Sequence, residues 1–142
     1  MKKLYTTSIA LTCLILFNSC SKDFLRSYED RIVGTWVLEE INRVGFGGST
    51  QDLPFRGGSF VFSEGGGLTY TDPAGNVYSG SWDIQRHTYE ERTVRTLQLH
   101  AVNFSSQNMK SEYFEEMNFT GTNKFKAYLQ QGLHRFVFHF ER

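Results

Sequence analysis

Residues 124–140 read KFKAYLQQGLHRFVFHF, and this stretch decides the fold. Apolar side chains occupy every second position on either side of Gln131-Gly132, a dipeptide that suits a turn. A period of two is typical of a β-strand that buries one face and exposes the other to water. When the stretch is folded at the turn, Leu129 faces Phe136 and both strands bury the same face. The stretch therefore predicts an antiparallel hairpin.

The same alternation continues through most of the chain from residue 32 onward. Turn-forming segments rich in glycine, asparagine and aspartate separate the alternating runs. The predicted strands cover residues 32–42, 57–63, 67–72, 77–86, 93–103, 111–119, 123–130 and 133–142. Folding at the turns predicts facing apolar pairs on a common face: Phe62 with Leu68, Trp82 with Leu97, and Phe119 with Phe125.

These patterns predict an all-β fold. Eight antiparallel strands with short connections, and no helical segment able to cover a sheet, favour closure into an up-and-down barrel. A β-sandwich of two sheets is the alternative. Phe24, Tyr28 and Ile32 lie at helical spacing, which predicts a short N-terminal helical turn capped by Ser21 or Asp23.

The first residues have the pattern of a secretory signal. Lys2 and Lys3 precede an apolar run that is shorter than the roughly 20 residues needed to cross a bilayer as a helix. Leu16-Phe17-Asn18-Ser19-Cys20 resembles a lipobox, the site at which lipoprotein signal peptidase cuts before a cysteine that becomes acylated. A plain secretory signal followed by a free cysteine is the alternative.

The lipobox resemblance implies a division into three parts. Residues 1–19 are the lipoprotein signal peptide, residues 20–31 are the lipidated cysteine and a tether, and residues 32–142 are the β-barrel domain. Cys20 is the lipidation residue, and acyl chains on it would anchor the protein in a membrane. The implied location is the cell envelope, at the outer membrane, on its periplasmic or surface face.

Composition and motifs exclude several classes of function. The 15 Lys and Arg balance the 15 Asp and Glu and form no basic run, so no nucleic-acid partner is expected. Of the two cysteines, Cys13 lies within the signal, which leaves no cysteine pair for a disulfide or a metal. No hydrolase, Walker or zinc-protease motif occurs, so no catalytic residue, metal or cofactor is predicted.

Gly34-Thr35-Trp36 resembles the Gly-x-Trp signature on the first strand of lipocalins. Phe60-Val61-Phe62-Ser63, Gly80-Ser81-Trp82 and the phenylalanine-rich last strand are similar to small bacterial lipoproteins with a lipocalin-like domain. The resemblance covers most of residues 32–142. It implies that Trp36 plugs the closed end of the barrel beside Gly34, and that an arginine, Arg135 or Arg142, packs over it. The Thr-Asp-Tyr motif of lipocalins and the helix after their barrel have no counterpart here.

An eight-stranded barrel is just wide enough to be filled by side chains or to hold one small ligand. Twelve aromatic side chains are predicted to face inward: Trp36, Phe60, Phe62, Tyr70, Tyr78, Trp82, Tyr113, Phe119, Phe125, Phe136, Phe138 and Phe140. By the lipocalin resemblance, residues 43–58 lie over the open end as a lid. Val44, Phe46, Leu53 and Phe55 then either cover an apolar ligand or plug the barrel.

Six residues are candidates for ligand binding: Arg86, Arg95, Glu115, Tyr70, Tyr78 and Tyr113. The forked donors of Arg86 and Arg95 suit a carboxylate ligand. In the alternative, the two arginines pair with Glu90 and Glu91 at the hairpin tip. Glu115 falls on the inward parity, so it needs a polar partner or a bulge in the strand.

Two functions follow from this sequence. The first is an envelope-anchored lipoprotein whose lipocalin-like domain binds a small apolar or amphipathic ligand. The second is a filled structural barrel that acts as a protein-interaction module with an envelope protein as partner. A lipocalin-like enzyme ranks behind both. The interior decides between the first two, because a ligand barrel needs an enclosed cavity of at least about 300 Å³.

The lipobox is tested by the intact mass of protein purified from membranes. We expect the mass of residues 20–142 plus acyl chains, because the thiol of Cys20 is the acceptor. Cys20→Ala should abolish both the cleavage and the mass increment, whereas Cys13→Ala should change neither. An unmodified mature chain would rule out lipidation.

Overall fold

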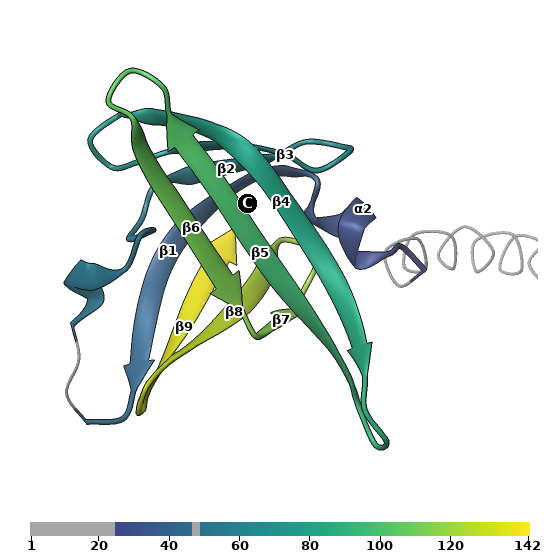
Figure 1. The fold of residues 1–142 in the computed structure, drawn as a ribbon. Coiled ribbons are helices and arrows are strands. Elements are labelled where there is room, and N and C mark those ends of the chain that lie inside the picture. Colours follow the sequence, from purple (N-terminus) through teal and green to yellow (C-terminus); the bar gives the residue numbers. More distant parts are fainter. Residues whose placement is uncertain (1–24, 47–48) are drawn as a thin grey trace, which may run out of the picture. The chain divides into compact units, whose positions relative to one another are not determined.

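A computed structural model describes residues 25–46 and 49–142 (Figure 1). The chain divides into two units, Met1–Arg31 and Ile32–Arg142. The helical elements are α2 (Tyr28–Ile32) and the 3-10 turn η1 (Thr50–Asp52). The strands are β1 (Gly34–Val44), β2 (Ser59–Phe62), β3 (Gly67–Thr71), β4 (Val77–Thr88), β5 (Thr93–Asn103), β6 (Asn108–Phe114), β7 (Glu116–Phe119), β8 (Lys124–Gln131) and β9 (His134–Glu141).

The short helical turn is present at the predicted place. The Ser27 hydroxyl caps it by accepting a hydrogen bond of 3.1 Å from the Asp30 amide. The predicted caps Ser21 and Asp23, and the lipidation residue Cys20, lie outside the described residues. Within the described part of the chain, no helix is long and apolar enough to span a membrane.

All nine strands belong to one sheet in the order β6-β5-β4-β3-β2-β1-β9-β8-β7. Every pairing in this sheet is antiparallel. The all-β prediction is therefore confirmed, and one continuous hydrogen-bonded sheet does not match a sandwich of two sheets. The predicted closed eight-stranded barrel is wrong, because no ladder joins the two edge strands β6 and β7 among the described residues.

The sheet stays open because the predicted strand 111–119 is two strands separated by a bend at Glu115. Before the bend β6 pairs with β5, and after it β7 pairs with β8 at the opposite edge of the sheet. Figure 1 shows this change of neighbour, with β6 beside β5 and β7 beside β8. The two edges are thus joined by the chain at Glu115 and not by a ladder.

The bend also reverses which side chains of β6 face inward. Phe114 and Met117 are both buried although they lie three positions apart, so one extra residue breaks the alternation, as in a β-bulge. The inward predictions for Tyr113 and Glu115 are therefore wrong: Tyr113 is 46% exposed, and Glu115 is exposed at the bend. Glu112 instead shares the parity of Phe114.

Most of the predicted register holds. Phe62 faces Leu68, and Phe119 faces Phe125. The 124–140 hairpin is paired as predicted, with Leu129 facing Phe136. Trp82 faces Leu99 instead of Leu97. That shift is two residues, an even number, so the buried face of the hairpin is unchanged.

Aromatic rings from distant strands meet on the inner face of the curled sheet. The Trp36 ring on β1 lies 4.8 Å from that of Phe125 on β8, and Phe114 on β6 lies 4.9 Å from Phe138 on β9. Apart from Tyr113 and the half-buried Phe119, the predicted inward rings are buried: Trp36, Phe60, Phe62, Tyr70, Tyr78, Trp82, Phe125, Phe136, Phe138 and Phe140. These rings pack against one another on the inner face of the curled sheet.

Part of the connection between β1 and β2 plugs the interior, and we call residues 49–58 the plug segment. Leu53 and Phe55 are buried, and the Phe55 ring lies 4.9 Å from that of Tyr70. The predicted lid residues Val44 and Phe46 are exposed, Phe46 fully. The hypothesis that this connection plugs the interior is therefore correct for Leu53 and Phe55. It is wrong for Val44 and Phe46.

Gly80 is a position at which a side chain does not fit. A Cβ on Gly80 would fall on the carbonyl oxygen of His100 on the neighbouring strand β5. We therefore expect Gly80→Ala to destabilise the domain by about 1–3 kcal/mol, as overpacking does in other cores. Gly121→Ala is the control, because a Cβ there meets no atom within 4 Å. Urea unfolding measures both, and equal stabilities would contradict the packing shown here.

Candidate functional site

The six candidate ligand-binding residues do not form one site. Tyr70 and Tyr78 lie near a hollow beneath the β1–β2 connection. Tyr113 and Glu115 line a second hollow on the outer face of the β4–β5 hairpin. Arg86 and Arg95 lie directly across from each other in the β4–β5 ladder.

The first hollow, which we call the plug hollow, measures about 390 Å³. Its lining comes from the plug segment, the β3–β4 turn and β6: Thr50, Gln51, Pro54, Arg56, Tyr70, Asp72, Pro73, Ala74 and Lys110. The Lys110 ammonium donates a hydrogen bond of 2.8 Å to the Pro54 carbonyl and lies 5.2 Å from the centre of the Tyr78 ring. One lysine thus ties β6 to the plug segment and to β4.

Two groups in the plug hollow have shifted pKa values. Burial, and next the nearby Asp72 carboxylate, raise the pKa of Tyr70 to about 12, and its hydroxyl donates to the Gly57 carbonyl at 2.9 Å. The Asn76 side chain is the main cause that lowers the pKa of Asp72. The Asp72 carboxylate also accepts from the amides of Ala74 and Asn76. At neutral pH the hollow therefore holds a neutral phenol, a carboxylate held by its own turn, and the cations of Arg56 and Lys110.

The second hollow, which we call the hairpin hollow, measures about 480 Å³. It is lined by His87, Tyr89, Arg92, Val94, Thr96, Tyr113 and Glu115. Its floor is the outer face of the sheet. Leu97 points into the core, and Val94 lies three positions before it on the same strand, so Val94 and its ladder partner His87 face outward. The site prediction named two of these residues and missed the other five.

Arg86 and Arg95 lie on the opposite face of the hairpin. On the inward parity, the pair Arg86–Arg95 lies next to the pair Ile84–Leu97, on the side of the hairpin tip. Arg86 is exposed and forms no ion pair with Glu90 or Glu91 in the described part of the chain. The two arginines therefore do not join Tyr113 and Glu115 in a single site.

The signature residues meet at the other end of the sheet. The Arg142 guanidinium lies 4.4 Å from the centre of the Trp36 ring and donates hydrogen bonds of 3.1 Å to the carbonyls of Val33 and Thr122. The Trp36 indole donates to the Ile32 carbonyl at 2.7 Å. Gly34 has a φ of +130°, and a Cβ on it would lie 3.2 Å from the Arg142 guanidinium. Of the two candidate arginines, Arg142 is the one over Trp36.

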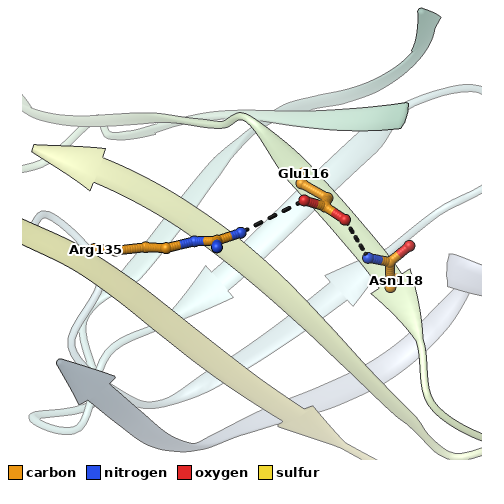
Figure 2. A network of polar contacts seen from close by, with 3 residues as sticks. All are labelled: Glu116, Asn118 and Arg135. Atoms are coloured by element: carbon orange, nitrogen blue, oxygen red, sulfur yellow. Dashed lines mark hydrogen bonds and ion pairs between the residues drawn. The ribbon is translucent and has the colours of Figure 1, made fainter. Parts of the chain in front are cut away.

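Arg135 takes part in a different contact, drawn in Figure 2. Its guanidinium lies 3.5 Å from the Glu116 carboxylate and 4.5 Å from the centre of the Tyr128 ring. The Asn118 amide donates to the other oxygen of Glu116 at 2.8 Å. These groups come from β7 and β9, on either side of β8, so they brace the outer face of three neighbouring strands.

Two inward polar residues of β6, Lys110 and Glu112, were missed at the sequence level. Tyr113 and Phe114 are adjacent aromatics, so either parity gives a plausible buried face, and only the bend decides between them. Glu112 faces Leu99 in the ladder, and burial raises the pKa of its carboxyl group. No cluster of three or more potential metal ligands occurs among residues 25–46 and 49–142.

Comparisons of the chain with protein-family models, curated proteins and solved structures gave no match.

The Glu112 carboxyl predicts a pH-dependent stability. Its pKa is raised on folding, so the folded state keeps the proton to higher pH and this group weakens the fold as pH rises through its titration. We expect Glu112→Gln to raise the free energy of unfolding more at pH 7 than at pH 4. Glu64→Gln, which alters an exposed carboxylate in the β2–β3 turn, is the control. A gain that is the same at both pH values would contradict the burial of Glu112.

Proposed function

We propose that this chain is a lipid-anchored envelope protein whose residues 32–142 form a lipocalin-like module with a filled interior. The module acts by docking on an envelope protein through its surface and does not carry a ligand inside the sheet. The packing of the inner face is the observation that carries this proposal.

The interior is occupied by the protein's own rings. Phe55 enters from the plug segment and packs against Phe60 at 5.5 Å and against Tyr70 at 4.9 Å. Farther along, the rings of Phe125 and Phe140 stack at 4.4 Å. An apolar ligand would have to displace buried aromatic side chains, each of which contributes strongly to the core.

The lipocalin-like part of the proposal rests on the end of the sheet that contains Trp36. A glycine, a buried tryptophan and an arginine over the indole occur together there, as the family resemblance implies. The envelope location and the lipid anchor rest on the N-terminal sequence alone.

Exposed apolar side chains where β1 ends beside the β8–β9 turn support this docking. Phe46 is 100% exposed and Leu133 is 91% exposed, and Val44 is exposed beside them. A Cβ on Gly45 would lie 3.1 Å from the Leu133 carbonyl, so the two segments are in contact. We call Val44, Phe46 and Leu133 the tip patch. Exposed apolar side chains gathered at one tip are a feature of protein-binding surfaces.

The docking proposal is tested by photo-crosslinking in cells that make the full chain. A photoreactive phenylalanine analogue at position 46 should give one dominant protein adduct, and Leu133→Ser should reduce it at least about fivefold, since the two side chains form one patch. The same analogue at Phe104, an exposed position on the β5–β6 turn, gives the background.

Two results would contradict this function. The first is an adduct at position 46 that is unaffected by Leu133→Ser. The second is a stoichiometric apolar or amphipathic molecule in the native mass spectrum of the purified chain, which would favour the ligand-carrying function.

A further inference from the structure

The hairpin hollow is a recess with more polar groups than packing of the sheet requires. Its volume of about 480 Å³ lies within the range of small-molecule sites, about 300–1,000 Å³. Three separate segments build it: the end of β4 with the hairpin tip, the start of β5, and the residues around the Glu115 bend.

The recess exists because β6 stops pairing with β5 at Leu97, before it reaches the start of β5. The last residue of β6 in the ladder is Phe114, which faces Leu97, so the first residues of β5 have no β6 neighbour. The tip turns back there, with the Tyr89 amide donating to the Arg92 carbonyl at 2.9 Å. Val94 and Thr96 are only 8% and 5% exposed although they face outward, which makes this surface a walled recess.

The lining favours a particular ligand chemistry. Tyr89 and Tyr113 stand on the rim with exposed rings, and Val94 is the only aliphatic residue in the lining. Arg92 and Glu115 are both exposed and carry opposite charges that cancel. A purely apolar ligand would find few partners here, and an ionic ligand would find as much repulsion as attraction.

One polar atom in this lining lacks a partner. The Nε2 atom of His87 is buried and makes no hydrogen bond with the described residues. Buried polar atoms are paired in the great majority of cases, so an unpaired one invites an explanation. If the ring turns so that Nε2 faces the hollow, a ligand hydroxyl satisfies it in either tautomer, because a hydroxyl both donates and accepts.

We propose that the hairpin hollow binds a neutral oligosaccharide. The rings of Tyr89 and Tyr113 offer flat apolar faces to the C–H faces of sugar rings, while their hydroxyls stay wet. Neighbouring sugar hydroxyls donate to the two oxygens of Glu115 and accept from the forked donors of Arg92. A rotation of the His87 ring brings Nε2 to a third hydroxyl. This site is on a different part of the surface from the tip patch, and it depends neither on that docking nor on the lipid anchor.

The proposal is tested by saturation-transfer difference NMR on the full chain in a sugar-free detergent, lauryldimethylamine oxide. The probes are maltohexaose, cellohexaose, chitohexaose and mannohexaose, with trigalacturonate as an acidic comparison. We expect at least one neutral hexaose to bind. Tyr113→Ala and Arg92→Ala should each weaken that binding about tenfold or more, because each removes one side of the recess.

Phe104→Ala, which removes an exposed aromatic ring outside the recess, is the matched control and should change the affinity less than twofold. Circular dichroism of each variant shows whether it has kept its fold, and Glu115→Gln, which preserves shape, replaces any variant that has not. The proposal is overturned if no neutral hexaose binds, if only trigalacturonate binds, or if binding survives the substitutions in the recess.

Discussion

The ring of Phe125 holds the curled sheet together. It lies 4.8 Å from Trp36 on β1, 6.4 Å from Phe62 on β2, 5.6 Å from Phe119 on β7 and 4.4 Å from Phe140 on β9. Aromatic pairs of this kind contribute about 0.5–1.5 kcal/mol each beyond the area they bury. In the sheet β1 and β9 lie between β2 and β8, so the contact between Phe125 and Phe62 joins strands that share no backbone hydrogen bonds. The curvature of the sheet therefore depends on side-chain packing.

Aromatic rings pack the inner face of the sheet, and the hollows described above lie at its surface. Both hollows lie where the regular ladder is interrupted: the plug hollow beneath the β1–β2 connection, and the hairpin hollow beside the bend at Glu115. Polar side chains line both hollows. Lys110 and Tyr113 lie on the same strand, β6, but on opposite faces, so a single irregular strand supplies one wall to each hollow.

The sequence predicted the regular parts of the sheet well, because a period of two tolerates even errors. Trp82 faces Leu99 and not Leu97, yet it still lies on the inner face. The prediction failed at residues 111–119, where the adjacent aromatics Tyr113 and Phe114 allow either parity and an extra residue reverses it. It also failed to separate Phe46 from Phe55 in the β1–β2 connection, since loops lack the periodicity that tells a buried ring from an exposed one. Both candidate hollows depend on these two irregular segments, so their composition was only partly predictable.

Strand parity alone distinguishes Arg142 from Arg135 as the arginine over Trp36. Positions 136, 138, 140 and 142 share one parity, and the phenylalanines at the first three point into the core. Position 142 continues this parity, so Arg142 points toward Trp36, whereas Arg135 falls on the outer face. At that position the guanidinium joins three chain segments, because it stacks on the indole of β1 and reaches the carbonyls of Val33 and Thr122. The plug hollow and the hairpin hollow lie elsewhere, along β6 and its bend, where the edge strand has a backbone partner on one side only.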